Sequence, residues 1–259
     1  MYKRQALENV TISHSGGAGI LVDSCRQVTV KNCTVNHTAN EGIRVVSSRQ
    51  VEIQGCKISE TTDHGILVFW DGSICREPQF VRLTGNTIDG TSQGAGIGIA
   101  SGNEIEINGN TISRGGLTGI ALYEQSRFFS PRRIVISENT IRQSPHNPFS
   151  YVKGAVGIYK CFGGKEGASD FSLLKNQIDL PNGTGIWISN NRPQKEQRPY
   201  AIKSLVIEGN RFAVRTGVEV HRSLIEKLAI KGNTFDGAPG EMLQMKEEQR
   251  GEVREFVFE

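Results

Sequence analysis

The chain of 259 residues contains no apolar run long enough to cross a membrane, so the sequence predicts no transmembrane span. Its formal net charge of +3 is too small to indicate a nucleic-acid partner. No spacing of cysteine and histidine typical of a zinc site occurs, and we expect no metal site. The eight prolines lie outside the recurrent apolar segments described next, as a continuous strand ladder requires.

The chain is instead rich in repetition. A first phrase has alternating apolar residues, a two-residue gap, Asn or Cys, one further residue and a final apolar residue. Its copies are VTVKNCTV, VEIQGCKI, VRLTGNTI, IEINGNTI, IVISENTI, FSLLKNQI, LVIEGNRF and LAIKGNTF. A second phrase, Gly-apolar-x-apolar, follows as GILV, GIRV, GILV, GIGI, GIAL, GIYK, GIWI and GVEV. Period-two alternation is typical of strands, and this repeat of strands and turns predicts a solenoid.

The intervals between the copies vary while the phrases stay constant. We take the starts as Val10, Val28, Val51, Val81, Ile105, Ile134, Phe171, Leu205 and Leu228. The first interval is then the shortest, because Val10 and Val28 are only 18 residues apart. We therefore expect strands to hold the register and loops to absorb the insertions.

One polar slot recurs within the first phrase and holds Cys33, Cys56, Asn86, Asn110, Asn139, Asn176, Asn210 and Asn233. Asn tolerates left-handed backbone at a sharp bend and can hydrogen-bond neighbouring backbone. We predict a buried ladder of amides that belongs to the scaffold. A disulfide between Cys33 and Cys56 is geometrically conceivable, but two buried thiols are favoured. The five cysteines therefore leave the cellular compartment open.

The two ends of the chain differ. The amino end shows no signal-peptide pattern, and Met1–Gln5 reads as the prefix of a gene fragment, so we expect a truncated start. Residues 241–252 are charge-rich with helix-forming composition, and residues 254–259 look like a strand. We expect a single domain over residues 1–259, with residues 241–259 as a cap.

From about Val10 to Phe258 these phrases resemble the right-handed parallel β-helix superfamily, with its pectate-lyase-like fold. The resemblance implies an all-β solenoid of about nine coils, with loop insertions in the middle and later coils. The superfamily includes polysaccharide lyases, glycoside hydrolases, uronan epimerases, carbohydrate esterases, phage tailspikes and modules without known activity. The fold therefore does not fix the function. We expect a secreted, carbohydrate-active protein, in an extracellular or periplasmic location.

The outward positions of the second phrase form the candidate binding face. We read them as Leu21, Arg44, Leu67, Gly98, Ala121, Tyr159, Trp187 and Glu219. Small residues at Gly98 and Ala121 predict the floor of a trough, with Tyr159 and Trp187 as an aromatic wall on which sugar rings would stack. In the alternative interpretation, long loops cover these aromatics as a second core layer.

Basic residues concentrate beside this face. Between Tyr123 and Lys165, only Glu124 and Glu138 oppose seven bases, Arg127, Arg132, Arg133, Arg142, Lys153, Lys160 and Lys165. This charge suits an anionic ligand such as a uronate or a sulfated glycan. The alternative is an ordinary solvated loop cluster. We expect an acidic polysaccharide as the partner, and the sequence leaves the oligomeric state open.

Candidate catalytic residues are few. His64 shares a slot with Glu41 of the previous coil, and an imidazole beside a carboxylate can act as an acid or a base. Lys160 breaks the second phrase next to Tyr159, and positions that break a local rule are often functional. We predict His64, Lys160 or Tyr159 as a proton acceptor; the alternatives are a surface ion pair and a misregistered loop strand. The predicted substrate-binding residues are Trp187, Arg127, Arg133, Asp71, Glu124 and Arg44.

Most catalytic signatures known in the superfamily are missing. Polygalacturonase-like hydrolases carry Asn-Thr-Asp, Asp-Asp, Gly-His-Gly and Arg-Ile-Lys segments. This chain has Asn-Thr-Ile at Asn86–Ile88 and Asn110–Ile112, and no Asp-Asp pair. It also shows no carboxylate cluster for Ca²⁺, so we expect no cofactor. The sequence favours a lyase or epimerase acting on an acidic polysaccharide; the alternative is a non-catalytic glycan-binding or structural β-helix of the tailspike or surface-repeat type.

Overall fold

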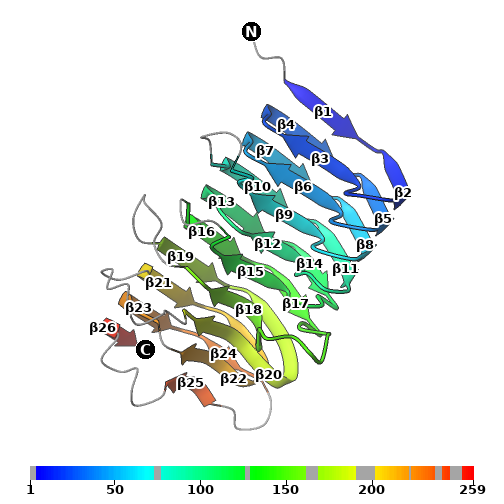
Figure 1. The fold of residues 1–259 in the computed structure, drawn as a ribbon. Coiled ribbons are helices and arrows are strands. Elements are labelled where there is room, and N and C mark those ends of the chain that lie inside the picture. Colours follow the sequence, from blue (N-terminus) through cyan, green and yellow to red (C-terminus); the bar gives the residue numbers. More distant parts are fainter. Residues whose placement is uncertain are drawn as a thin grey trace.

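The protein is a stack of parallel strands (Figure 1). The computed structural model describes residues 4–72, 77–125, 129–161, 169–190, 202–221, 223–236, 241–245 and 253–259. Every regular element in these ranges is a strand, so they hold no helix that could span a membrane.

One sheet, called sheet A here, contains ten parallel strands that follow one another along the stack. They are β1 (Gln5–Glu8), β4 (Arg26–Lys31), β7 (Arg49–Gln54), β10 (Gln79–Thr84), β13 (Asn103–Asn108), β16 (Arg132–Ser137), β19 (Ser169–Leu174), β21 (Ile202–Glu208), β23 (Ile225–Lys231) and β26 (Val253–Phe258). Val28 pairs with Val51, and Val51 pairs with Val81. The prediction that these residues stack in neighbouring coils is confirmed.

The second sheet, sheet B, has sixteen strands arranged in two limbs. The first limb contains β2 (Thr11–Ser15), β5 (Thr34–Thr38), β8 (Lys57–Thr61), β11 (Thr87–Thr91), β14 (Thr111–Ser113) and β17 (Thr140–Arg142). The second limb contains β3 (Ile20–Asp23), β6 (Ile43–Val46), β9 (Ile66–Phe69), β12 (Ile97–Ile99), β15 (Ile120–Tyr123) and β18 (Gly154–Tyr159). The long strands β20 (Gln177–Ser189) and β22 (Arg211–His221) run through both limbs, and β22 also pairs with β24 (Thr234–Phe235) and β25 (Glu241–Met245).

Sheet A and the two limbs enclose one apolar core. Alternate residues of each strand point inward, and Ile53, Leu83 and Ile107 are fully buried in successive coils. Each such side chain contributes about 1.5–3 kcal/mol by leaving water. The period-two alternation of the sequence therefore becomes a continuous inner surface along the stack, with the other alternate positions left outside.

The first phrase crosses a corner of the coil. Residues 81–84 lie in β10 of sheet A, and residues 87–88 already belong to β11 of sheet B. The start assigned to Val10 is wrong, because Gln5 is the residue that pairs with Val28. The first interval is thus 28 − 5 = 23 residues, equal to the next one, and Val10 lies at the position that Asn or Cys takes in later coils.

The predicted asparagine ladder is present at this corner. The amide of Asn110 donates to Oδ1 of Asn139 at 2.9 Å and to the carbonyl of Leu83 at 2.9 Å. Its own Oδ1 accepts both the backbone N–H and the amide of Asn86. The same contacts continue through Asn176, Asn210 and Asn233. Asn233 is half-buried rather than buried, which corrects the prediction at the last step.

The reason proposed for asparagine at this corner is partly wrong. The residue before the slot adopts the left-handed conformation, as at Gly85 (φ 62°), Gly109 (φ 62°) and Glu138 (φ 57°). Asparagine is required for its amide, which joins neighbouring coils. Cys33 and Cys56 are free buried thiols, and burial raises the pKa of Cys56 to about 11.

The carboxyl-terminal region continues the sheets. Glu241–Met245 forms β25, so its helix-forming composition does not produce a helix. Neighbouring strand edges decide its conformation, since Val218 of β22 pairs with Leu243. The strand expected near the end is present as β26, which pairs with β23. The prediction that residues 241–259 cap the domain stays a prediction.

Candidate active site on the second limb

The outer face of the second limb carries the row of small residues that the sequence predicted. Leu67 pairs with Gly98, and Gly98 pairs with Ala121. Ala121 then pairs with Gly157, and Gly157 with Trp187. The floor of the predicted trough is therefore one residue longer than expected.

The position predicted for Tyr159 is wrong, because the second phrase is shifted by two residues in β18. Tyr159 pairs with Tyr123 and lies in the adjacent row of the same face. Lys160 follows as an exposed corner residue with φ 54°. Lys160 is not apolar because it follows the end of β18 and does not face the core.

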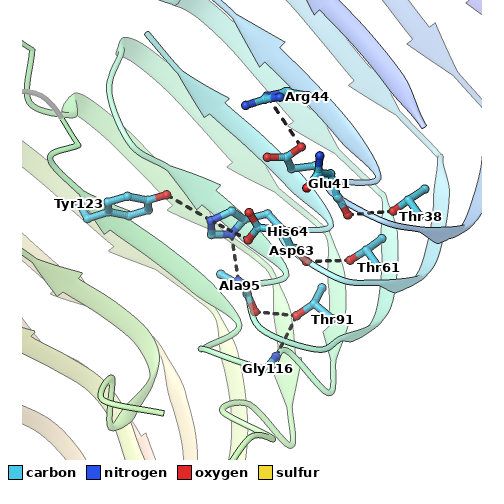
Figure 2. A network of polar contacts seen from close by, with 12 residues as sticks. Thr38, Glu41, Arg44, Thr61, Asp63, His64, Thr91, Ala95, Gly116 and Tyr123 are labelled. Atoms are coloured by element: carbon cyan, nitrogen blue, oxygen red, sulfur yellow. Dashed lines mark hydrogen bonds and ion pairs between the residues drawn. The ribbon is translucent and has the colours of Figure 1, made fainter. Parts of the chain in front are cut away.

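His64 lies at the corner where the chain enters β9, and its imidazole covers Gly98. A Cβ atom added to Gly98 would lie 2.7 Å from both Cε1 and Nδ1 of His64, so glycine is required there. The corner is fixed by two threonines of the first limb (Figure 2). Thr61 donates to the carbonyl of Asp63 at 2.8 Å, and Thr91 donates to the carbonyl of Gly94 at 2.7 Å. Part of the predicted trough is thus filled by a histidine.

Two hydrogen bonds determine where the proton of His64 resides. The backbone N–H of Ala95 donates to Nδ1 at 2.9 Å, so Nδ1 must be the unprotonated nitrogen. The proton lies on Nε2, which is 3.1 Å from Oη of Tyr123 and donates to it (Figure 2). Burial lowers the pKa of His64 and outweighs the raising effect of Asp63 and Glu41. His64 is therefore held neutral, as a hydrogen-bond donor to Tyr123.

Charged groups surround this pair on its amino-terminal side. Oδ1 of Asp63 lies 3.6 Å from Nε2 of His64, and the Asp63 side chain is 45% exposed. Glu41 is buried in the neighbouring coil, where Gly42 N–H donates to the carbonyl of His64. Nε of Arg44 lies 3.8 Å from Oε2 of Glu41. Glu41 and His64 therefore occupy neighbouring coils at the same slot, as predicted.

Arg44 is held at the edge of this cluster. Its guanidinium lies 4.8 Å above the ring centroid of Phe69. The side chain is 35% exposed, and Nε has no hydrogen-bond partner. Such a guanidinium can bind a carboxylate from solvent.

Tyr123 connects His64 to an aromatic cluster. Its ring stacks on Tyr159 with centroids 5.2 Å apart and planes 2° apart, and Tyr151 meets Tyr159 edge-on. Burial raises the pKa of Tyr123, and the charge of Asp63 adds to this effect. Burial likewise raises the pKa of Tyr159, which is only 3% exposed. Both phenols are therefore protonated at neutral pH, and a protonated phenol can supply a proton.

A loop covers the later part of the floor. Val152 packs against Gly157, where an added Cβ would lie 2.5 Å from Cγ1 of Val152. Val152, Tyr159 and Ala121 form a small outer apolar cluster, against which the half-buried Trp187 packs. The interpretation as a second core layer therefore holds for Tyr159, while Trp187 keeps an accessible surface.

Three further predicted binding residues within the described ranges lie apart from His64. Arg133 is on β16 of sheet A and pairs with Glu104 at 2.7 Å. Asp71 is exposed and lies 3.4 Å from Oγ of Ser47. Glu124 is buried and accepts a hydrogen bond from Ser130. Arg127 lies outside the described residues.

The predicted basic cluster is spread over different parts of the coil. Arg132 is buried on sheet A and pairs with Glu77 at 2.5 Å. Lys153 donates to the carbonyl of Ser150 at 2.9 Å, and Lys165 lies outside the described residues. The part of the cluster that the structure describes does not form one positive patch.

Sequence reasoning missed the two most informative contacts, those of Tyr123 and of the Ala95 amide with His64. Tyr123 directly follows the phrase GIAL, at the outward row next to the small residues. An aromatic residue at that place, beside a row of glycine and alanine, was the available signal. No repeat in the sequence predicts that the backbone N–H of Ala95 donates to His64.

One hollow of about 570 Å³ lies away from this site, on the outer face of sheet A, and is lined in part by Phe80, Arg82 and Glu106. Arg82 and Glu106 already pair at 3.0 Å there. Within the described ranges, no three His, Cys, Asp or Glu side chains converge as metal ligands.

Solved structures with similar folds include sugar-polymer enzymes. The A-module of a mannuronan C-5 epimerase from Azotobacter vinelandii is 15% identical, with a TM-score of 0.64, over 99% of this chain and 57% of that one. A periplasmic alginate epimerase is 14% identical, with a TM-score of 0.63, over 85% and 48%. An α-1,3-glucanase catalytic unit from Streptomyces thermodiastaticus is 19% identical, with a TM-score of 0.65, over 99% and 48%.

At these identities the similarity shows the fold alone, and the chain spans about half the length of these structures. No curated protein sequence matches the chain. The family described as "Right handed beta helix region" matches residues 1–82 and 74–247. Together with the parallel stack of coils, this match shows that the chain belongs to the right-handed β-helix family.

Proposed function

We propose that the protein acts on an acidic polysaccharide by acid-base chemistry at the His64–Tyr123 pair. The observation that carries the proposal is a buried neutral histidine whose Nε2–H is directed at a phenol on the outer face. Burial and the charge of Asp63 keep Tyr123 protonated, and the Nε2–H of His64 would donate a hydrogen bond to the phenolate that forms when Tyr123 gives up its proton, so the arrangement favours Tyr123 as a general acid. His64 would have to lose its bond to Ala95 before it could accept a proton.

The proposed reaction starts at the carbon next to a uronate carboxylate. A base removes the proton from this carbon, and the electron pair spreads into the carboxylate. In a lyase, the bond to the adjacent glycosidic oxygen then breaks, and Tyr123 gives its proton to that oxygen. In an epimerase, Tyr123 gives its proton to the same carbon from the opposite side. In both reactions the base gains one proton and Tyr123 loses one, and exchange with solvent restores the two groups afterwards.

Other residues of the cluster have separate proposed roles. Asp63 is the base that we favour, because its exposed carboxylate lies beside Nε2 of His64. Arg44 would pair with a uronate carboxylate. Tyr159 is a weaker candidate for the base, since burial keeps its hydroxyl protonated. Lys160 stays a candidate on the sequence argument alone.

Two of the similar structures are epimerases of mannuronan and alginate, and this supports the choice of an acidic glycan. An extracellular or periplasmic location fits such a substrate. A non-catalytic glycan binder is the second candidate function. It is favoured by the 5% exposure of His64 and by the similarity to a tailspike protein and a surface adhesin.

The test is a screen of alginate, polygalacturonate and glycosaminoglycans with two readouts. Ultraviolet absorbance of unsaturated ends reports a lyase, and uptake of deuterium from heavy water without chain cleavage reports an epimerase. The proposal expects one signal, and expects that Asp63→Asn and Tyr123→Phe abolish it. Binding without either signal would favour the non-catalytic function, and an unchanged rate in Tyr123→Phe would refute the acid role.

A further inference from the structure

A second cluster of polar and aromatic side chains lies on the same outer face, on β20 and β22. Nε2 of His221 is 2.5 Å from Oε1 of Glu219. The other carboxylate oxygen, Oε2, accepts a hydrogen bond from Oγ1 of Thr184 at 3.0 Å. The ring of Trp187 lies 6.2 Å from that of His221, with the planes tilted by 48°. The strand register brings these side chains together, because Trp187 of β20 pairs with Glu219 of β22 and His221 follows two residues later.

This cluster is accessible, whereas the core beneath it is closed. The side chains of His221 and Glu219 are 24% and 19% exposed, and Trp187 is half-buried. By contrast, Ile188 and Val218 on the inner sides of the same strands are fully buried. A ring that offers an apolar face beside an oriented carboxylate is suited to a sugar, which has C–H faces and hydroxyl edges.

The position of the cluster is fixed relative to Tyr123. Tyr123 pairs with Tyr159, Tyr159 with Ser189, and Ser189 with His221. Three strand spacings therefore separate Tyr123 from His221, which is roughly 14 Å along the stack. Tyr159 lies between them, stacked on Tyr123 and only 3% exposed, and the exposed Tyr151 packs on it from outside, so a bound chain would pass over Tyr151.

We propose that Trp187, Glu219 and His221 form a remote subsite for a polysaccharide that lies along the stack. This inference rests on the proposed function, and it adds the direction of the bound chain. An extended sugar unit is about as long as one strand spacing, so the subsite takes a ring about three units from Tyr123. Glu219 would repel a carboxylate, so the subsite binds hydroxyl groups of that ring while Trp187 covers its apolar face.

The test measures affinity as a function of chain length. Calorimetric titration uses alginate and polygalacturonate oligosaccharides of two to eight units, with every protein also carrying Tyr123→Phe to prevent turnover. The subsite predicts that affinity rises once a chain spans both places. We expect Trp187→Ala and Glu219→Gln each to reduce the ratio of long-chain to short-chain affinity about tenfold. Glu208→Gln, an exposed carboxylate on sheet A of the same coil, is the matched control and should keep the ratio.

The outcomes separate the two proposals. A ratio unchanged in both Trp187→Ala and Glu219→Gln would overturn the subsite and leave the proposed function standing. Binding of no oligosaccharide by any of the proteins would overturn both. Thermal unfolding checks that each variant is folded, and His221→Gln gives a third, independent reading if one of the others fails to fold.

Discussion

The protein contains two sets of buried polar groups, the asparagine ladder and the cluster at His64, and they differ in how their hydrogen bonds are satisfied. In the ladder, Asn110 has both its amide and its carbonyl oxygen bonded to neighbouring coils, and the same contacts recur coil after coil. The cluster at His64 occurs once. It also leaves Oε2 of Glu41 and Nε of Arg44 without hydrogen bonds.

The difference separates scaffold from site. A fully paired buried network stabilises one structure, and repetition lets each coil contribute the same bonds. An unrepeated cluster with charged atoms that lack hydrogen bonds gains nothing from the repeat, and such departures from local rules are typical of functional sites. Mutations in the ladder should therefore lower stability, whereas mutations in the His64 cluster should lower activity.

The largest effect is expected from Tyr123→Phe. Removing a general acid should reduce turnover about 10²–10⁴-fold, while the unfolding temperature changes little. Initial rates on the polysaccharide identified by the screen, together with thermal unfolding, measure both quantities. Tyr151→Phe is the matched control, because its ring is 57% exposed and its hydroxyl is not bonded to His64. A large loss of stability in Tyr123→Phe would place Tyr123 with the scaffold.

Gly98→Ala should damage the site without changing any reactive group. The new Cβ would lie 2.7 Å from two ring atoms of His64, so the ring must shift from the position in which Nε2 contacts Tyr123. Displacement by about 1 Å costs on the order of 10²-fold in rate. Gly17→Ala is the control, since nothing lies within 4 Å of a Cβ at that glycine. Equal rates in the two variants would contradict the placement of His64.

Asn110→Ala should break the ladder and leave the specific activity of the folded protein intact. The change strands the buried N–H of Asn86 and the carbonyl of Leu83, at about 1–3 kcal/mol in the free energy of unfolding. Urea unfolding monitored by circular dichroism measures it. Cys56→Ala occupies the same slot without an amide, and its weak thiol contacts should cost about 1 kcal/mol or less. Equal losses in both variants would argue against the ladder.

The smallest effect is a pH dependence of stability. Burial lowers the pKa of His64 in the folded protein below its usual 6.5, so the unfolded chain binds more protons below that pH. Stability is therefore complete above about pH 6.5 and falls as the pH drops through that value. Asp63, Glu41 and Tyr123 face the ring, and His64→Gln removes its titration alone. Thermal unfolding from pH 7.5 to pH 5 should have a shallower slope in His64→Gln; parallel slopes would contradict a neutral buried ring.

The sequence alone was sufficient for the architecture. Two phrases of period-two alternation predicted the stacked coils, and the recurrent Asn slot predicted the ladder, because each of these features is local and repeats in every coil. His64 was singled out by the slot that it shares with Glu41, and Arg44 by its outward position in the second phrase; their roles stay predictions. Even the wrong start at Val10 was visible as an interval that did not fit.

Tertiary structure decided the site. Tyr123 lies 59 residues beyond His64 in the chain, and their contact depends on how the intervening strands are registered. The two-residue shift in β18 has the same origin. Tyr159 and Lys160 lie two residues from their predicted positions because pairing with β15 and β20 sets the register. A sequence repeat specifies how each coil pairs and packs with the next coil. Which exceptional residues meet across several coils is decided only when loops of unequal length have closed and the strands have paired.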